Sequence, residues 1–326
     1  MSLDSLGISW TDGTLNSLYG CWTCSIGCRL CYAVNRVHRH SSNPKLNHDG
    51  RFDGLVHNGR FTGEVLFDPR HLYGVLKDRN PKMIFVNEFS DLLHEVIPME
   101  TVLEHFRVFK AAQWHQFQVL TKRSHRLAEL NTAVLQEFGS WPTNVWQGVS
   151  VCSVSQAETQ RIEHLGATGA FLKWISFEPW VSDPSFPVSE AVPGLREILR
   201  ENQIQWTVIG GESGPRDDTN IMAIDDARHL VNESRAAGSR VHFKQLGTAL
   251  AIQLGTHSTR GGAEHRAKGG NPDQWPEDLN IREWPEVEWN NLAEPVEFRP
   301  SYDAGRRIHL RASPTETQKV DVDKIL

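Results

Sequence analysis

Four of the five cysteines in this chain of 326 residues lie within eleven residues, at Cys21, Cys24, Cys28 and Cys31. Their spacing is Cys-x2-Cys-x3-Cys-x2-Cys. Five cysteines are too few for a disulfide framework in a chain of this length, and bridges among the four would close very short loops. Such crowding predicts a metal centre.

An iron–sulfur cluster is the first candidate for that centre. A [4Fe–4S] cube held by three thiolates keeps one iron open, and this iron can chelate the amino and carboxylate groups of S-adenosylmethionine (SAM). Cys24-x3-Cys28-x2-Cys31, followed by Tyr32, has the spacing of the radical SAM signature, in which one short loop wraps three corners of the cube. The loop therefore predicts a cluster, with Tyr32 beside the cofactor.

A structural zinc site is the alternative, because Cys-x2-Cys pairs are common zinc ligands. Zinc sites generally take two pairs from separate segments, so four ligands within eleven residues would be unusually tight. The second hypothesis is accordingly a zinc-stabilised, non-catalytic nucleic-acid-binding module. Its weak points are the net charge of −6 and the lack of a basic stretch, which also argue against duplex nucleic acid as a partner.

The elements that must position this loop are short apolar strands that alternate with amphipathic segments. Helical spacing predicts helices over Pro98–Ala112 and Asp225–Ala237. Strand and helix repeat about six times, which predicts a parallel α/β sheet, either a barrel or an open doubly wound sheet. The expected strands are Met83–Val86, Gln116–Leu120, Val145–Val151, Leu172–Phe177, Trp206–Ile209 and Arg240–Phe243.

Polar residues follow nearly every expected strand. Ligands of parallel α/β folds bind at the carboxyl ends of strands, and contributions from every strand favour a complete or partial barrel over a single crevice. The candidate site residues at these ends are Asn87, Glu88, Ser90, Asp91, Thr121, Lys122, Arg123, Glu178, Gly210, Gly211, Glu212 and Lys244.

Each group suits a particular role. The carboxylates of the Asn87–Asp91 segment could bind an ammonium group or a ribose hydroxyl, or else Ser90 or Asp91 caps a helix. The cations of Thr121–Arg123 could meet a carboxylate or phosphate, with solvated surface charge as the alternative.

The later strand ends suggest further contacts with a ligand. Gly210 and Gly211 allow a ligand to approach the backbone closely, with Glu212 at the mouth of the site. No Gly-Lys-Ser/Thr follows them, so this is not a Walker loop. Glu178 and Lys244 are candidates for substrate contact or proton transfer.

Ten blocks of sequence carry a resemblance that runs from about residue 7 to 285. They are Gly7–Asp12, Gly20–Ala33, Phe85–Leu92, Gln118–Arg123, Gly148–Val151, Ser176–Pro179, Ile209–Gly214, Phe243–Gln245, Lys268–Gly270 and Trp275–Leu279. Through them the chain resembles a poorly characterised radical SAM family whose members usually carry only the name "phage protein". The resemblance implies an α/β fold, a partial (β/α)6 TIM-like barrel of the radical SAM type with a C-terminal extension. It also implies a [4Fe–4S] cluster and SAM as cofactors, with Ser150 near them.

The usual cysteine pattern of that family aligns with Cys21, Cys28 and Cys31 and lacks a cysteine at position 24. This chain has one thiol more than either pattern needs. Four ligands would close the open iron, so we expect three ligands and one spare thiol, which is either Cys21 or Cys24.

The resemblance implies a radical SAM enzyme that cleaves SAM reductively to a 5′-deoxyadenosyl radical, with electrons from an external flavodoxin- or ferredoxin-type donor. The cations and tryptophans suit a small nucleoside or nucleotide substrate. Some members occur in the biosynthesis of albomycin-type thionucleoside antibiotics, so sulfur-for-oxygen exchange is the specific expectation. Cys152 alone lies outside the loop, too few cysteines for a second all-cysteine cluster.

The chain divides into two expected regions. Residues 1–248 form the partial barrel, with the cluster loop at 20–33 and a polar insertion at 35–62. Residues 249–326 form a C-terminal extension that closes the barrel, with a loose tail from about residue 313. The sequence shows no targeting signal and no apolar run approaching the roughly 20 residues of a membrane helix, so we expect a cytoplasmic protein without a membrane partner.

Overall fold

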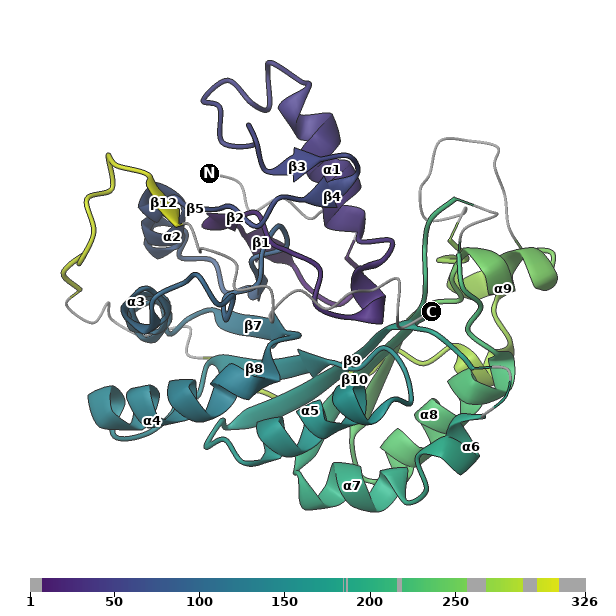
Figure 1. Cartoon of the computed structure of the whole chain (residues 1–326). Coiled ribbons are helices and arrows are strands. Elements are labelled where there is room, and N and C mark those ends of the chain that lie inside the picture. Colours follow the sequence, from purple (N-terminus) through teal and green to yellow (C-terminus); the bar gives the residue numbers. More distant parts are fainter. Residues whose placement is uncertain are drawn as a thin grey trace.

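A computed structural model describes residues 8–310, with gaps at 184, 186, 216–218, 257–267 and 290–297. Within these residues, seven strands form a parallel sheet that curls into a half-barrel (Figure 1). Across the sheet they are β1 (Gly13–Leu15), β6 (Met83–Val86), β7 (Gln116–Thr121), β8 (Val145–Ser150), β9 (Leu172–Trp180), β10 (Ile204–Gly211) and β11 (Arg240–Gln245).

The strand order follows the order along the chain, and every pairing in this sheet is parallel. A doubly wound sheet reverses its order at a switch point, so the structure decides between the two predicted architectures in favour of a partial barrel. All six predicted strands are confirmed. β1 was missed because Gly-Thr-Leu is too short to show a hydrophobic period.

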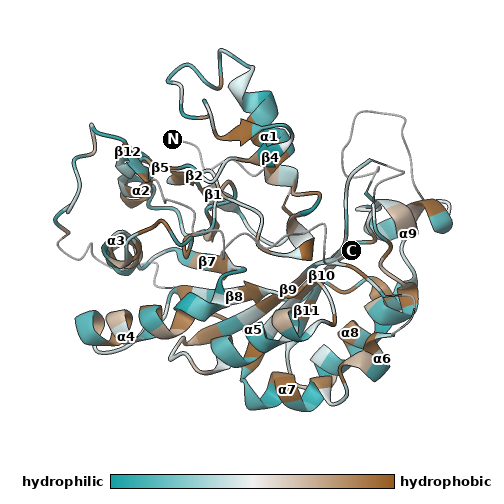
Figure 2. Cartoon of the chain, viewed as in Figure 1, coloured by the Kyte–Doolittle hydropathy of each residue, from teal (hydrophilic) through white to brown (hydrophobic). Residues whose placement is uncertain are grey.

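Helices cover the outer face of the sheet, with apolar sides inward and polar sides outward (Figures 1 and 2). The two predicted helices are confirmed within a residue at each end, as α3 and α8. α3 buries Val102, Phe106 and Phe109, the face that its spacing predicted. The helices of this layer are α3 (Met99–Ala111), α4 (Leu127–Phe138), α5 (Gln156–Gly166), α6 (Val188–Ala191), α7 (Leu195–Glu201) and α8 (Ile224–Ala236).

Tryptophans fill the inside of the half-barrel. Trp146, Trp174 and Trp206 come from adjacent strands and are fully buried. Trp10 lies edge-on against Trp174 and Trp206, with ring centroids 5.3 and 6.0 Å apart. Gly148 in β8 makes room for this packing, because a Cβ there would lie 2.5 Å from the Trp174 ring. Trp146, Trp174 and Trp206 are therefore core side chains rather than a surface for stacking on a ligand.

The N-terminal region stands over the opposite side of the sheet from α5 and α7 (Figure 1). After the cysteine loop, the first part of the polar insertion is helical, and a short hairpin follows. A second, small sheet has the strand order β12-β5-β2. The elements are η1 (Ile26–Cys28), α1 (Tyr32–Ser41), β2 (Leu18–Tyr19), β3 (Val56–His57), β4 (Arg60–Phe61), β5 (Val65–Phe67), α2 (Pro69–Gly74) and β12 (Ile308–Leu310).

The described part of the C-terminal extension contacts both ends of the fold. Residues 281–283 run along the open edge of β11, where Phe243 N donates to Ile281 O and Glu283 N to Val241 O. At the other end, β12 pairs antiparallel with β5. The predicted tail from about residue 313 lies outside the described residues. In the described part of the chain, no helix combines the length and apolar character needed to cross a membrane.

Candidate functional site

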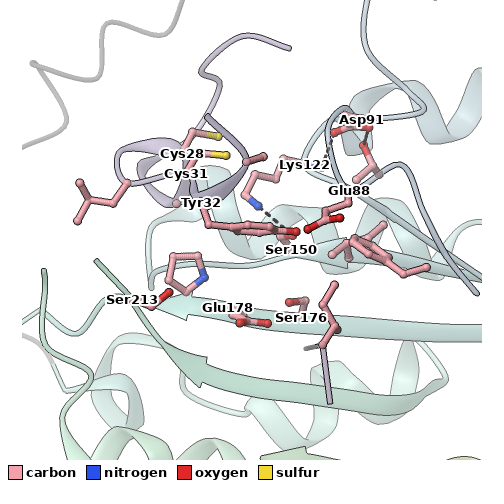
Figure 3. A pocket seen from close by; sticks show the side chains of 18 of the residues that line it. Cys28, Cys31, Tyr32, Glu88, Asp91, Lys122, Ser150, Ser176, Glu178 and Ser213 are labelled. Carbon is pink, nitrogen blue, oxygen red and sulfur yellow. Dashed lines mark hydrogen bonds between the residues drawn. The ribbon is translucent and has the colours of Figure 1, made fainter. Parts of the chain in front are cut away.

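A cavity of about 180 Å³, here called the inner cavity, lies between the cysteine loop and the carboxyl ends of the strands (Figure 3). Cys21, Cys28 and Cys31 line it, whereas Cys24 and Gly210 are not among the described lining residues. The other predicted site residues that line it are Tyr32, Asn87, Glu88, Ser90, Asp91, Thr121, Lys122, Arg123, Ser150, Glu178, Gly211, Glu212 and Lys244. The structure thus gathers candidates from every predicted strand end around one space.

Close packing fixes the cysteine loop. Gly20 has a φ of +98°, and a Cβ at this position would lie 2.0 Å from the carbonyl oxygen of Glu64. Ser25 caps η1 by accepting a hydrogen bond from the amide of Gly27. A Cβ on Gly27 would lie 2.3 Å from Sγ of Cys152. Cys152 is therefore the buried surface on which the loop rests.

Asp91 and Arg123 attach the loop to the sheet. Asp91 accepts hydrogen bonds from Thr121 Oγ1 at 2.8 Å and from Arg123 Nη1 at 3.0 Å. Burial opposes ionisation, but the Arg123 guanidinium holds the pKa of Asp91 below its usual value. Nη2 of Arg123 donates to the carbonyl of Trp22 at 3.1 Å and to Sγ of Cys21 at 3.5 Å. In this structure Asp91, Thr121 and Arg123 position the loop, and the oxygens of Asp91 are engaged within the chain.

Lys122 brings a second positive charge to the thiols. Its Nζ donates to Ser150 Oγ at 3.2 Å, and Figure 3 shows the side chain beside Cys28 and Cys31. Burial disfavours the ammonium form, but the neighbouring thiols of Cys152 and Cys28 raise the pKa of Lys122 overall. A hydrogen bond from Cys24, together with the charge of Lys122, lowers the pKa of the Cys28 thiol to about 5. The loop therefore places the thiol of Cys28, whose pKa is lowered, beside the positive charge of Lys122.

The donor chemistry of the loop fits a metal cofactor that binds thiolates. Three thiols line one cavity, and Lys122 and Arg123 offset the negative charge that thiolates bring. Among the described residues, no three His, Cys, Asp or Glu side chains are grouped as ligands of a single ion. The cysteine side chains would therefore turn toward one another on binding, whether the cofactor is a cluster or zinc.

Asn87 and Glu88 each use one side-chain polar atom for hydrogen bonds within the fold and have a second polar atom without such a bond among the described residues. Asn87, with a φ of +62°, accepts hydrogen bonds through Oδ1 from the amides of Ser17 and Leu18, both at 3.1 Å. Glu88 Oε1 accepts from Arg36 at 2.8 Å. Asn87 Nδ2 and Glu88 Oε2 are buried and have no hydrogen-bond partner among the described residues. Burial raises the pKa of Glu88. These two atoms form a donor and an acceptor available to a ligand.

The far wall of the cavity contains the remaining candidates. Glu178 and Lys244 form an ion pair there, and Figure 3 places Glu178 across the cavity from the cysteines. Glu212 accepts hydrogen bonds from Arg29 of the cysteine loop at 3.0 Å and from the amide of Asn220 at 2.7 Å. Glu212 therefore holds the loop against the end of β10, while its Oε1 is buried without a partner among the described residues.

The two glycines at the end of β10 have a packing role. A Cβ on Gly211 would lie 2.3 Å from the carbonyl oxygen of Leu246, and one on Gly210 would lie 3.3 Å from Gln245 Cγ. They allow β10 to pack closely against the end of β11 and the segment that follows it. This contact differs from the predicted close approach of a ligand, although Gly211 also lines the inner cavity.

A second cavity of about 320 Å³, the outer cavity, adjoins the first and shares Tyr32, Glu88 and Lys244 with it. Arg36 and Arg39 of α1 line the outer cavity, and sequence reasoning did not propose them. Tyr32, Arg36 and Arg39 are spaced at i, i+4 and i+7. A helix predicted directly after Cys31 would have placed both arginines on the same face as Tyr32.

Comparisons with known proteins show the family to which the chain belongs. No curated protein matches the chain. A solved structure described as "PaMucR Phosphodiesterase, c-di-GMP complex" is 16% identical, covers 48% of this chain and 68% of that chain, and has a TM-score of 0.27, too low to establish a common fold. A family model described as "Protein of unknown function (DUF5131)" matches residues 5–290. The chain therefore belongs to the DUF5131 family.

Proposed function

We propose that this protein is a radical SAM enzyme whose [4Fe–4S] cluster is held by Cys21, Cys28 and Cys31, with Cys24 as the spare thiol. The observation that carries the proposal is that these three thiols line one cavity at the carboxyl edge of a curled parallel sheet. Cys24 is outside that lining. The choice of ligands follows from this difference, because a cluster in the cavity is accessible to the three thiols that face it.

Such a cluster, when bound, supplies the electron that splits SAM into methionine and a radical that removes hydrogen from a substrate. The chain contributes charge and shape. Lys122 and Arg123 offset the negative charge of the thiolates. Asn87 Nδ2 and Glu88 Oε2 offer a donor and an acceptor to the methionine or ribose groups of SAM.

The deeper wall of the cavity is apolar. Trp10, Phe85 and Leu120 line it and belong to one cluster of packed hydrophobic side chains. An apolar wall keeps water away from a reactive intermediate and holds a ligand in one orientation. Glu178 and Lys244, on the wall across the cavity from the cysteines, could contact the substrate or move a proton.

We propose a nucleoside-type substrate and an external one-electron donor, with sulfur-for-oxygen exchange as the specific reaction. The two adjoining cavities, of about 180 and 320 Å³, share lining residues, so a cofactor bound beside the cysteines and a substrate bound in the outer cavity would lie next to each other. Cys152 is the only cysteine outside the loop, too few for a second all-cysteine cluster, so any inserted sulfur would come from the one cluster or from outside the protein.

Anaerobic purification followed by iron and sulfide analysis tests the proposal. A brown protein with about four irons and four sulfides per chain supports it. Incubation with dithionite and SAM should then yield 5′-deoxyadenosine. A colourless protein that holds stoichiometric zinc after anaerobic reconstitution would establish the zinc-stabilised binding module instead. An iron–sulfur protein that forms no 5′-deoxyadenosine would contradict the enzymatic part of the proposal.

A further inference from the structure

Glu212 and Gln245 line the inner cavity from the ends of two adjacent strands. Glu212 directly follows β10, and Gln245 is the last residue of β11, which pairs with β10 in parallel. The two side chains are only 2% and 3% exposed. In each of them Oε1 is buried and has no hydrogen-bond partner among the described residues. Two buried acceptors beside one cavity call for a ligand that brings hydrogen-bond donors.

The other polar atom of each side chain is bonded within the fold. Oε2 of Glu212 accepts hydrogen bonds from Arg29 at 3.0 Å and from the amide of Asn220 at 2.7 Å. Nε2 of Gln245 donates to the carbonyl of Gly211 at 2.8 Å. Because the amide nitrogen of Gln245 is the donor in that bond, the remaining atom is an acceptor. Both oxygens are therefore positioned before a ligand arrives, which lowers the entropic cost of binding.

The charges around the inner cavity favour neutral donors over an ammonium group. Four carboxylates are among the described residues that line this cavity, and each of them is in an ion pair. The pairs are Glu88 with Arg36, Asp91 with Arg123, Glu178 with Lys244, and Glu212 with Arg29. A bound ammonium would add a buried positive charge to carboxylates that are already balanced, whereas hydroxyl groups donate hydrogen bonds without adding charge.

A ribose with such hydroxyls could belong either to SAM or to the substrate. Asn87 and Glu88, which we propose for SAM, follow β6, near one end of the strand order. Glu212 and Gln245 stand at β10 and β11, at the other end of that order. Gln245 also lines the outer cavity, the space proposed for the substrate. This separation favours the substrate as the source of the hydroxyls.

We infer that the substrate is a ribonucleoside-type compound whose vicinal 2′- and 3′-hydroxyls donate to Oε1 of Glu212 and Oε1 of Gln245. This inference rests on the proposed function, because it describes the substrate of that reaction. Ser213, which directly follows Glu212, lies with Glu178 on the side of the cavity opposite Cys28 and Cys31 (Figure 3). The bound sugar would accordingly lie across the cavity from the cysteines.

Isothermal titration of the anaerobically reconstituted, full-length protein in excess SAM tests the inference. The ligands are uridine, cytidine and inosine, each compared with its 2′,3′-dideoxy form. Excess SAM fills its own site, so that the ribose under test is that of the added nucleoside. At least one ribonucleoside should bind, at least about tenfold more tightly than its dideoxy form, because loss of the hydroxyls leaves two buried acceptors unpaired.

Two variants remove the acceptors one at a time. Glu212→Gln can still accept from Arg29 through its amide oxygen but has a donor in place of Oε1, and Gln245→Met removes Oε1 altogether. Each should weaken binding of the ribonucleoside about tenfold and leave binding of the dideoxy form and of SAM unchanged. The matched control Glu233→Gln breaks a pair with Arg196 outside both cavities and should keep the full preference.

Equal affinity of wild type for the ribonucleosides and their dideoxy forms, or no binding of any of them, would overturn the inference. Variants that lose affinity for SAM and not for the ribonucleoside would assign the two oxygens to the ribose of SAM and overturn it as well. Iron content and 5′-deoxyadenosine formation are measured on the same samples. A protein without iron that still prefers the ribonucleoside would refute the proposed reaction and leave the diol site standing.

Discussion

Arg123 and Asp91 form a buried ion pair directly beneath the cysteine loop, with 3.0 Å between Nη1 and Oδ2. The same guanidinium reaches Cys21 Sγ and the carbonyl of Trp22 through its other terminal nitrogen. One residue therefore joins the carboxyl end of β7, the segment after β6 and the first cysteine of the loop. The Arg123 guanidinium that holds the loop would therefore also lie next to the thiols when they bind a metal.

Removing the carboxylate from this pair should be costly. We expect Asp91→Asn to lower the free energy of unfolding by about 2–3 kcal/mol, because buried Arg123 loses one of its two carboxylate partners and keeps only Glu95. Urea denaturation monitored by tryptophan fluorescence measures this loss. The control Glu129→Gln breaks an exposed pair with Arg126 and should cost less than about 1 kcal/mol. A loss of the same size in both variants would show that the pair does not hold the loop.

The iron content of four cysteine-to-alanine variants should distinguish the cluster ligands from the spare thiol. Cys21→Ala, Cys28→Ala and Cys31→Ala each remove a thiol that lines the inner cavity, and we expect each purified variant to lose most of its iron. Cys24→Ala should keep an iron content near that of wild type. Anaerobic reconstitution and iron analysis of the four variants give the answer. Retention of iron by Cys21→Ala and its loss from Cys24→Ala would reverse the assignment of the spare thiol.

Single and double variants of Gly27 and Cys152 test whether the cysteine loop depends on the contact between these two residues. Gly27→Ala places a methyl group 2.3 Å from Sγ of Cys152, so the loop must shift and the iron content should fall. Cys152→Ala alone removes only packing and should retain iron. In Gly27→Ala/Cys152→Ala the nearest contact is relieved, and iron binding should return. If the double variant binds no more iron than Gly27→Ala, the loop does not depend on this contact.

The sequence predicted six of the seven strands and the shared location of the site, because long apolar runs that end in polar residues report directly on a parallel sheet. It did not predict which polar atoms form hydrogen bonds within the fold and which remain available to a ligand. In the sequence, Asp91, Glu212 and Glu88 look alike, because each is a carboxylate that follows a predicted strand. Asp91 accepts hydrogen bonds from the segment after β7, Glu212 binds the cysteine loop, and Glu88 keeps one oxygen without a partner among the described residues. Such partners come from distant segments, which local patterns do not reveal.

Acid should destabilise the protein through His242, which is fully buried in β11 with its Nε2 2.9 Å from Ser9 Oγ. Burial, with smaller effects of Arg282 and Lys244, lowers the pKa of His242 from 6.5 to about 3. Between these values the unfolded chain takes up a proton that the folded protein does not. The stability from this residue is present above about pH 6.5 and falls by up to about 1.4 kcal/mol per pH unit as the pH decreases toward 3.

The variant His242→Gln isolates this effect, because it removes the titrating ring from the same buried position. The difference in free energy of unfolding between pH 7 and pH 5 should be smaller in the variant than in wild type by about 2 kcal/mol, the contribution of one proton over that interval. Urea denaturation at both pH values gives the two differences. Equal differences in wild type and His242→Gln would mean that His242 is protonated in the folded protein at pH 5, which its burial behind Trp284 and Trp206 opposes.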